Sequence, residues 1–346
     1  MNVIYGIILQ NFRNYSFRQF EFSPKINFFV GKNGSGKTNL LEAISLLGTS
    51  NGIKKAEIKH LNSNFITPFS IGLDTSYGNI GIKNHNGTKK FFLEDEQIKF
   101  ITLEKQFNII AMLPEDEFIF KSSTSERRKF FDNLISKVLP SHAELLKDYK
   151  NLCTQRAKIL NNFDNQNSWL STIEKQIAQK LIIITSNRVL ISEKLSNIMQ
   201  SLKNTNLHGS IILSGQLENK IQNNNFISLV EENLLAKELE MARSVDAITG
   251  KTLTKFEKTN FDILFKLKNM KATQSSAGEQ KQMLFSFFLS IVKSSKSAII
   301  LIDEVMDKLD LENKKIIFSE IESTKGQFFL TGTEKFHSKS CNFIFI

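Results

Sequence analysis

The sequence predicts an α/β protein in which both ends of the chain build one largely parallel sheet and a helical lobe is inserted between them. Three observations support this fold. Short apolar or alternating runs between Gly and Asn turns fill the first part of the chain, which is typical of strands. No Gly occurs between Gly87 and Gly209, and apolar residues recur there at helical spacing. After residue 272, strand-like and helix-like runs alternate, as in parallel sheets.

The expected elements follow in chain order. The first strands cover residues 3–9, 20–22, 26–30, 69–73 and 80–83. Two helical runs come next, one through Leu145, Tyr149 and Leu160 and one from Trp169 to about Leu202, separated by an Asn-rich turn over 161–167. The last part predicts a helix from about Ser276, a strand at 298–302, a helix at 311–323, and strands at 328–331 and 342–346. The boundaries expected are 1–113 and 245–346 for the α/β unit and 114–244 for the helical lobe.

Composition limits the class of protein. With 41% hydrophobic and 23% charged residues, this chain of 346 residues is an ordinary globular protein with room for two domains. No apolar run reaches membrane-spanning length and the N-terminus lacks a signal-peptide pattern, so we expect no membrane partner. Cys153 and Cys341 match no metal-ligand spacing. We expect both to be reduced thiols in a cytoplasmic protein.

The charge distribution favours a polyanionic partner. The net charge is +10 and the pI is about 9.3. Residues 114–244 carry 17 basic and 15 acidic side chains, a balance of +2, so the flanking segments hold the other +8. The basic side chains of those segments include Lys54, Lys55, Lys59, Lys83, Lys89 and Lys90. A solvated basic face, produced by a lysine-rich composition, is the alternative explanation.

A complete phosphate-binding loop follows the third expected strand: Gly31-Lys32-Asn33-Gly34-Ser35-Gly36-Lys37-Thr38. The run 26–30 before it is strand-like and the run 39–44 after it is helix-like, which is the context that this motif requires. Its glycines let backbone N–H groups surround a phosphate, and the helix N-terminus adds partial positive charge. Lys37 is placed to reach the β- and γ-phosphates, and the Thr38 hydroxyl is placed to hold Mg²⁺. The sequence therefore predicts that the chain binds a nucleoside triphosphate.

Two carboxylates, Asp303 and Glu304, follow the buried run 299–302. Open α/β sheets place their ligands at the carboxyl ends of strands. Asp303 is therefore expected in the Mg²⁺ shell opposite Thr38, and Glu304 is expected to act as the base that orients an attacking water. Lys37 and Glu304 are the expected catalytic side chains. A solvated acidic loop is the alternative for the two acids.

The segment Ser275-Ser276-Ala277-Gly278-Glu279-Gln280-Lys281 opens a predicted helix, because Ser276 and Glu279 have capping-box spacing. It resembles the signature segment of ABC ATPases, which in those proteins lies shortly before an Asp-Glu strand. The resemblance implies that Ser276 and Gly278 contact the γ-phosphate of a nucleotide bound by the other subunit of a dimer. Asp307-Lys308-Leu309-Asp310 resembles the D-loop of these ATPases, and residues 329–333 stand where their switch segment would be.

Within the ABC ATPases the chain resembles the RecF family of bacterial recombination proteins, which is related to SMC proteins. The residues that carry the resemblance are 11–15, 22–27 and 39–44, and more specifically Pro114-Glu115-Asp116, 126–132, Tyr149 and Gln155-Arg156 at the start of the helical arm. It covers most of the chain and thins between about residues 161 and 272. The resemblance implies an ABC/SMC-type ATPase head, a P-loop NTPase fold, with the helical lobe as an inserted arm.

The chain departs from the family pattern in two places. Many RecF proteins carry Gly-Pro-His-Arg-x-Asp before the signature. Here Lys255-Phe256-Glu257-Lys258-Thr259-Asn260 occupies that place and keeps only a basic group at Lys258. No glutamine matches the ABC Q-loop, since Gln106 lies too early. Both departures bear on the turnover rate more than on nucleotide binding.

The resemblance implies ATP and Mg²⁺ as cofactors and an ATP-dependent homodimer that clamps DNA. It further implies gapped DNA or single–double-strand junctions as substrate, weak DNA-stimulated ATP hydrolysis, a RecR-like partner and loading of RecA in replication, recombination and the SOS response to DNA damage. The alternative is an ATP-gated DNA scaffold with negligible turnover. A transport-type ABC subunit is disfavoured by the basic charge and the lack of a membrane segment, and a structural SMC protein by the short arm.

Overall fold

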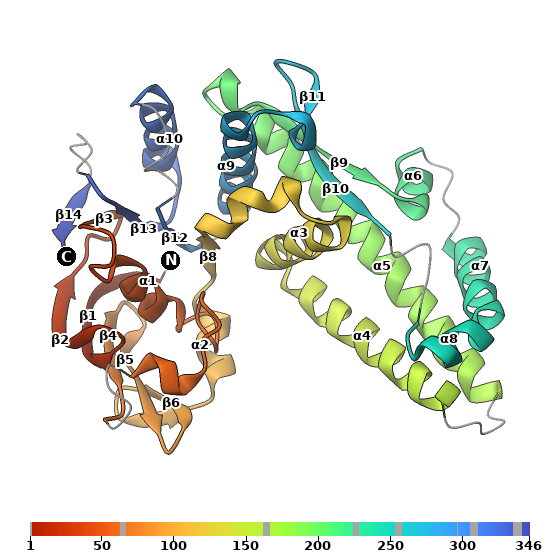
Figure 1. The fold of residues 1–346 in the computed structure, drawn as a ribbon, viewed down its shortest axis with the longest axis horizontal. Helices are drawn as coiled ribbons and strands as arrows, with labels where there is room; N and C mark the ends of the chain where they lie inside the picture. The colour runs from red at the N-terminus through yellow and green to blue at the C-terminus, as the bar shows by residue number, and fades with distance from the viewer. Residues whose placement is uncertain are drawn as a thin grey trace. The chain divides into compact units, whose positions relative to one another are not determined.

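The chain forms two compact units in the computed structural model (Figure 1). Unit 1 contains Met1–Glu117 and Ser295–Ile346, and unit 2 contains Phe118–Ser294. The structure describes residues 2–62, 67–161, 167–223, 228–252, 258–295, 297–304, 311–334 and 341–346. The predicted D-loop at 307–310, residues 255–257 and the centre of the Asn-rich turn lie outside these ranges.

Unit 1 contains the predicted parallel sheet, built from both ends of the chain. Its strand order is β14-β3-β13-β12-β8, and every neighbouring pair is parallel. The strands are β3 (Ile26–Val30), β8 (Ile109–Met112), β12 (Ile299–Ile302), β13 (Gln327–Gly332) and β14 (Asn342–Phe345). β3, β12 and β13 are buried along their whole length, as expected of parallel strands covered on both faces. The expected α/β fold class is confirmed.

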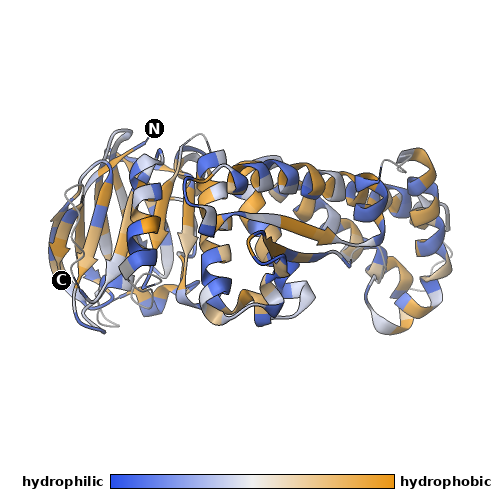
Figure 2. Ribbon diagram, turned by 90° about the horizontal axis from the view of Figure 1, so that it is seen from above, coloured by the Kyte–Doolittle hydropathy of each residue, from blue (hydrophilic) through white to orange (hydrophobic). Residues whose placement is uncertain are grey.

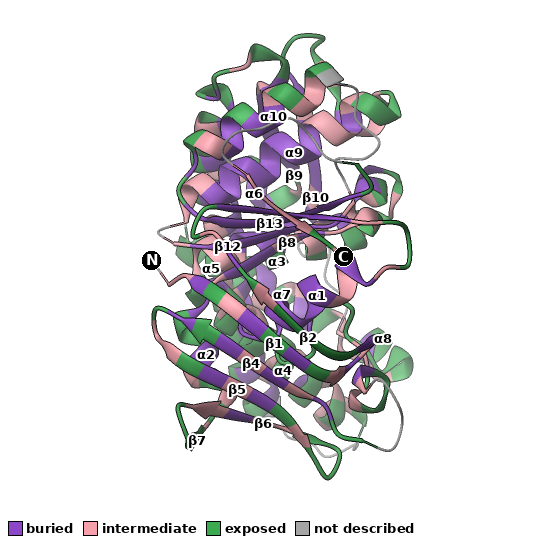
Figure 3. Cartoon of the chain, turned by 90° about the vertical axis from the view of Figure 1, so that its left-hand side faces the viewer, coloured by how far each residue is buried: buried purple, intermediate pink, exposed green. Residues whose placement is uncertain are grey.

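A second, antiparallel sheet of unit 1 has the order β2-β1-β4-β5-β6-β7. Its strands are β1 (Ile4–Phe12), β2 (Tyr15–Glu21), β4 (Ser70–Thr75), β5 (Gly78–His85), β6 (Thr88–Leu93) and β7 (Glu96–Ile98). Figure 3 shows buried and exposed residues alternating along β1, β4 and β5, so one face packs inward and the other meets solvent. The inward face shares a core with α1 (Lys37–Ser45) and with side chains of β3, β12 and β13.

In the described part of unit 1, two more α-helices and a 3₁₀ helix accompany the sheets. α2 (Phe100–Gln106) precedes β8, and α10 (Leu311–Ser323) connects β12 to β13. The 3₁₀ helix η1 (Ile58–Leu61) lies between α1 and β4 in the chain. A second 3₁₀ helix, η2 (Pro114–Lys121), follows β8 and runs across the boundary between the two units.

Unit 2 is mainly helical, as the spacing in the middle of the chain predicts. Its long helices are α3 (Thr124–Val138), α4 (Pro140–Asn161), α5 (Asn167–Gln200) and α9 (Ala277–Ser294). The 34 residues of α5 correspond to a length of about 50 Å. Figure 2 shows hydrophobic and hydrophilic residues mixed along these helices, as expected of helices with one buried face. The shorter helices are α6 (Gln216–Gln222), α7 (Ser228–Met241) and α8 (Arg243–Thr249), with 3₁₀ turns η3 (Thr205–Leu207) and η4 (Ala272–Gln274).

A buried arginine holds four helices of unit 2 together. Arg156 on α4 is fully buried and donates to Glu174 on α5 at 3.0 Å and to Asp246 on α8 at 2.6 Å. It also donates to the carbonyl of Leu239 on α7 at 2.6 Å. Burying a charge without partners is very costly, so this arginine needs all three groups. Arg156, which carries part of the family resemblance, therefore stabilises the packing of the helices in unit 2.

The observed units have other boundaries than the sequence suggested. Residues 245–294, which we expected in the α/β unit, lie in unit 2. The reason is an antiparallel sheet that pairs β10 (Asn260–Phe265) with β9 (Gly209–Ser214) and with β11 (Met270–Lys271). α9 packs beside this sheet and α5, burying its apolar residues. In the described parts of the chain, none of the helices combines the length and apolarity needed to cross a membrane.

Candidate nucleotide-binding site

The predicted phosphate-binding loop connects β3 to α1 at the carboxyl edge of the parallel sheet (Figure 1). Gly36 caps α1 with a φ of 115°, a conformation that side-chain-bearing residues rarely adopt. A Cβ atom there would lie 2.5 Å from the Asn14 amide nitrogen and 2.8 Å from the Tyr15 hydroxyl. Gly34 also has a positive φ, of 82°. Both positions therefore need glycine for the loop to turn into the helix.

The turn between β1 and β2 holds the loop from outside. The Asn14 side-chain amide donates to the carbonyl of Ser35 at 2.9 Å, and the Tyr15 hydroxyl donates to the carbonyl of Gly36 at 3.1 Å. Arg13 makes two bonds, of 2.7 and 2.9 Å, to the buried carboxylate of Glu42 on α1. Burial raises the pKa of the Tyr15 hydroxyl to about 12, so it stays a neutral donor. These supporting roles were not predicted from the sequence, although residues 11–15 carried part of the family resemblance.

The ammonium group of Lys37 lies inside the loop. Its side chain is 2% exposed, and Nζ donates to the carbonyls of Gly31 at 2.7 Å and Lys32 at 3.1 Å. Nζ also lies 3.9 Å from Oε1 of Glu304. A buried cation surrounded by backbone dipoles can exchange these carbonyls for phosphate oxygens of a nucleotide.

Thr38 and Asp303 come together although 265 residues separate them. Asp303 Oδ1 accepts hydrogen bonds from the hydroxyls of Thr38 at 3.1 Å and Thr331 at 2.8 Å. Burial raises the pKa of Asp303, and hydrogen bonds from both threonines oppose that shift. Thr331, near the end of β13, belongs to the segment 329–333 that was expected where the switch of ABC ATPases lies, but its bond to Asp303 was not predicted. Its strand lies beside β12 in a parallel sheet, which brings the two residues to the same edge.

This pair fits a magnesium ion. Mg²⁺ prefers oxygen ligands and is usually held by one or two protein groups together with phosphates and water. Thr38 and Asp303 supply one hydroxyl and one carboxylate, and a divalent cation would offset the burial that disfavours the charged form of Asp303. Among the described residues no cluster of three or more His, Cys, Asp or Glu could hold a metal by itself, which a nucleotide-bridged ion does not require.

Glu304 directs its carboxylate towards the same edge of the sheet. Its φ of 51° lies in the left-handed region, which costs about 1–2 kcal/mol for a residue with a side chain. Its backbone N–H donates to the Thr331 hydroxyl at 2.8 Å, which holds this conformation. The side chain is 39% exposed, so a water molecule can reach it. Strain of this kind is typical of functional sites.

Ser276 and Gly278 lie in unit 2, at the start of α9. Ser276 precedes the first helical residue, and its N–H and hydroxyl both donate to the carboxylate of Glu279, at 2.8 and 2.7 Å. Hydrogen bonds from Lys268 and Ser276 lower the pKa of Glu279 to about 2. Residues 276–278 are exposed, and a Cβ atom at Gly278 would meet nothing within 4 Å. The signature segment therefore presents an open helix start to solvent.

The predicted basic residues do not form one free surface. Lys59 pairs with Glu57 at 2.7 Å, the Lys89 ammonium donates to the Ser50 carbonyl, and Lys83 lies over the Phe92 ring at 5.4 Å. Burial lowers the pKa of Lys89. Lys54 and Lys55 are exposed beside the start of α1, with the Lys54 ammonium 3.1 Å from the Asn39 side chain. These two remain the strongest candidates for contact with a polyanion.

The comparisons with known proteins agree over nearly the whole chain. The family model of the RecF/RecN/SMC N-terminal domain matches residues 3–345. The DNA replication and repair protein RecF of Rickettsia bellii is 31% identical, with 97% of both chains covered. The protein of the same name from Rickettsia akari is 29% identical, again with 97% coverage of both.

Solved structures show the same fold. The recombination mediator protein RecF–ATPrS of the RecFOR pathway superimposes with a TM-score of 0.79 at 23% identity, covering 99% of this chain and 96% of that one. The Smc head domain of Pyrococcus furiosus gives a TM-score of 0.52 at 17% identity, with 96% and 90% covered. The chain therefore belongs to the RecF family of the RecF/RecN/SMC group, and its fold is an ABC/SMC-type ATPase head with an inserted helical lobe.

Proposed function

We propose that this chain is an ATP-dependent DNA-binding protein of recombinational repair. The observation that carries the proposal is the complete loop Gly31–Thr38, with Lys37 buried inside it and Thr38 bonded to Asp303. Family membership supplies the biological setting, because the relatives are DNA replication and repair proteins and one solved relative is a recombination mediator with a bound ATP analogue. The cytoplasm is the compartment in which such a protein would act.

The site residues divide the work on ATP. The loop N–H groups and Lys37 bind the phosphates, Thr38 and Asp303 hold Mg²⁺, and Glu304 accepts a proton from the attacking water. Mg²⁺ would neutralise charge on the β- and γ-phosphates. Thr331 keeps Asp303 and Glu304 in place through its single hydroxyl, which donates to one and accepts from the other.

ATP-dependent dimerisation would couple ATP binding to DNA binding. Ser276 and Gly278 of one subunit contact the γ-phosphate bound by the other, so two nucleotides join two heads. The exposed start of α9 supports this arrangement, because free N–H groups at a helix start favour anions. The homodimer would clamp gapped or junction DNA on a basic face that includes Lys54 and Lys55. A RecR-like partner would bind the clamp and promote RecA loading, as part of replication, recombination and the SOS response.

A scaffold with negligible ATP turnover is the second candidate. No glutamine of the sequence matches the Q-loop of ABC ATPases, since Gln106 lies at the end of α2, before β8. Glu304 also lies 3.9 Å from Lys37, which would compete with water for its carboxylate. Both observations favour slow hydrolysis and leave nucleotide binding intact.

The experiment that tests the proposal is DNA binding with and without ATP. A fluorescent gapped duplex is titrated with the full chain in Mg²⁺ buffer containing ATP, a non-hydrolysable analogue, or no nucleotide. We expect tighter binding with either nucleotide and no such gain in Lys37→Ala. Equal affinity under all three conditions would contradict ATP-dependent binding. Phosphate release measured in parallel separates the weak ATPase from the scaffold.

A further inference from the structure

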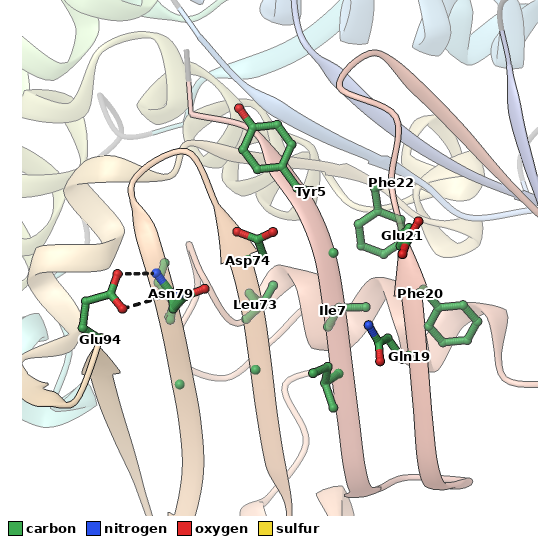
Figure 4. A pocket seen from close by; sticks show the side chains of 15 residues that line it. Tyr5, Ile7, Gln19, Phe20, Glu21, Phe22, Leu73, Asp74, Asn79 and Glu94 are labelled. Atoms are coloured by element: carbon green, nitrogen blue, oxygen red, sulfur yellow. Dashed lines mark hydrogen bonds between the residues drawn. The ribbon is translucent and has the colours of Figure 1, made fainter.

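The outer face of the antiparallel sheet in unit 1 is hollowed towards one end of its strands. A cavity of about 580 Å³ opens there, lined by β1, β2, β4 and β5 and by Glu94 from the turn after β6 (Figure 4). The opposite face of this sheet packs on the core that contains α1. The hollow is therefore separate from the nucleotide-binding loop, and the proposed ATP cycle gives it no task.

Two glycines form the floor of the hollow. Gly72 on β4 and Gly81 on β5 are direct cross-strand partners, between Ile8 on β1 and Phe92 on β6. A Cβ atom at Gly72 would have its nearest neighbour at 3.9 Å, and one at Gly81 at 3.5 Å, which are ordinary contacts. Neither glycine has a positive φ. The backbone therefore does not require glycine at either position.

Glycine in a strand interior destabilises the strand relative to alanine. Such a glycine often marks a place where a ligand or another backbone approaches closely. Gly72 and Gly81 together leave the floor of the hollow without side chains. The packing of the sheet does not explain this loss of strand stability. Their position therefore indicates a surface shaped for an incoming chain.

Exposed apolar side chains and carboxylates both line the hollow. Tyr5 is 45% exposed and Ile8 is 42% exposed, although both are large apolar side chains. In the adjacent row, Glu21 and Asp74 both lie opposite Gly6, so two exposed carboxylates flank the floor (Figure 4). Glu94 also lines the hollow, and its carboxylate accepts two bonds from Asn79. The local charge is thus negative in a chain whose net charge is +10.

We propose that this hollow docks an extended segment of a partner protein in which an apolar side chain and an Arg or Lys stand two residues apart, on the same face of the segment. The apolar side chain would fill the space over Gly72 and Gly81 beside Ile8. The cation two residues away would meet Glu21 and Asp74 in the adjacent row, because side chains i and i+2 of an extended chain lie on the same face. A polyanion such as DNA is disfavoured here by the same carboxylates.

The test uses a defined probe, a fluorescein-labelled peptide that repeats leucine, serine, arginine and serine so that leucine and arginine share one face, with fluorescence anisotropy on the full chain. Gly72→Leu fills the floor where space exists, and it should weaken binding by about tenfold or more because the leucine occupies the volume that an incoming apolar side chain would fill. Asp74→Lys should weaken binding to a similar degree through charge. Glu104→Lys, on the exposed side of α2, makes the same charge change away from the hollow and should leave affinity within about twofold.

Several results would overturn the proposal. One is equal binding of the peptide to parent, Gly72→Leu and Asp74→Lys; another is equal affinity for a peptide with glutamate in place of arginine. Loss of self-association in Gly72→Leu by analytical ultracentrifugation would assign the hollow to a second copy of the chain. Weaker DNA binding in that variant would assign it to nucleic acid. Nucleotide titration of the same variants should match the parent, so failure here is distinguishable from failure of the ATP-dependent function.

Discussion

Replacing Asp116 by asparagine should stabilise unit 1 at neutral pH and change little at about pH 3.5. Asp116 follows β8, and its carboxylate accepts a 2.8 Å bond from the Leu113 N–H, which an asparagine carbonyl can also accept. Burial raises the pKa of Asp116 to about 6, Glu115 adds to the rise, and Lys55 opposes it. The ionised form is therefore less favourable in the folded state than in the unfolded chain.

The sign and size of the change in stability follow from the number of protons that the folded and unfolded states bind. Between the ordinary aspartate pKa of 3.8 and the raised pKa of about 6, the folded state holds the proton that the unfolded state has lost, so stability falls as pH rises through this window. A shift of about two pKa units corresponds to at most about 3 kcal/mol. The side chain is only half-buried, so solvent screening reduces this free-energy difference. We therefore expect Asp116→Asn to raise the free energy of unfolding by about 1–2 kcal/mol above pH 7.

Hydrogen exchange of the β8 amides in nucleotide-free protein measures this gain at a series of pH values. Glu115→Gln is the matched control, because Glu115 is the exposed neighbour and changes charge equally. The gain in stability should develop between about pH 4 and pH 7 in Asp116→Asn, and it should be much smaller in Glu115→Gln. An equal gain at about pH 3.5 and pH 7.5, or no gain above pH 7, would refute the explanation by burial of the carboxylate.

Three further predictions concern the site. Lys37→Ala should weaken ATP binding by about 100-fold, because an ammonium inside the loop contributes about 3 kcal/mol; near-normal affinity in a fluorescent-nucleotide titration would contradict this. Glu304→Gln should keep ATP and Mg²⁺ binding and reduce phosphate release by about 100-fold or more, because an amide cannot accept the proton; parental turnover would place the base elsewhere. Lys54→Glu with Lys55→Glu should weaken binding to all DNA sequences alike and flatten its salt dependence, measured by titration from about 50 to 200 mM salt; unchanged binding would place the DNA contact on another surface.

Four strands of the parallel sheet were predictable because each is a short local run, whereas the edge strand β8 was not expected. β3, β12 and β13 read as short apolar runs with clear ends, and α10 begins and ends at the residues expected from spacing. Buried strands must be apolar on both faces, so composition alone identifies them. The phosphate-binding loop was equally local, since all its residues are consecutive.

The sheet of unit 2 was not predictable in the same way. β9 and β10 lie about 50 residues apart in the chain, and their pairing depends on packing against α5 and α9. The supporting roles of Asn14 and Tyr15 were missed because each acts through a bond to a backbone carbonyl that lies farther along the chain. Single polar side chains of this kind carry no spacing signal.

The central claim is that each nucleotide is held by the Gly31–Thr38 loop of one chain and by Ser276 of another. Mixing Lys37→Ala with Ser276→Arg tests it most directly, because each variant alone lacks one half of every site. The account predicts that Ser276→Arg binds ATP but does not dimerise in analytical ultracentrifugation with Mg-ATP. It further predicts that the mixture regains ATP hydrolysis from one composite site per dimer, which neither variant shows alone. Full ATP-dependent dimerisation of Ser276→Arg, or no recovered activity in the mixture, would contradict the shared site.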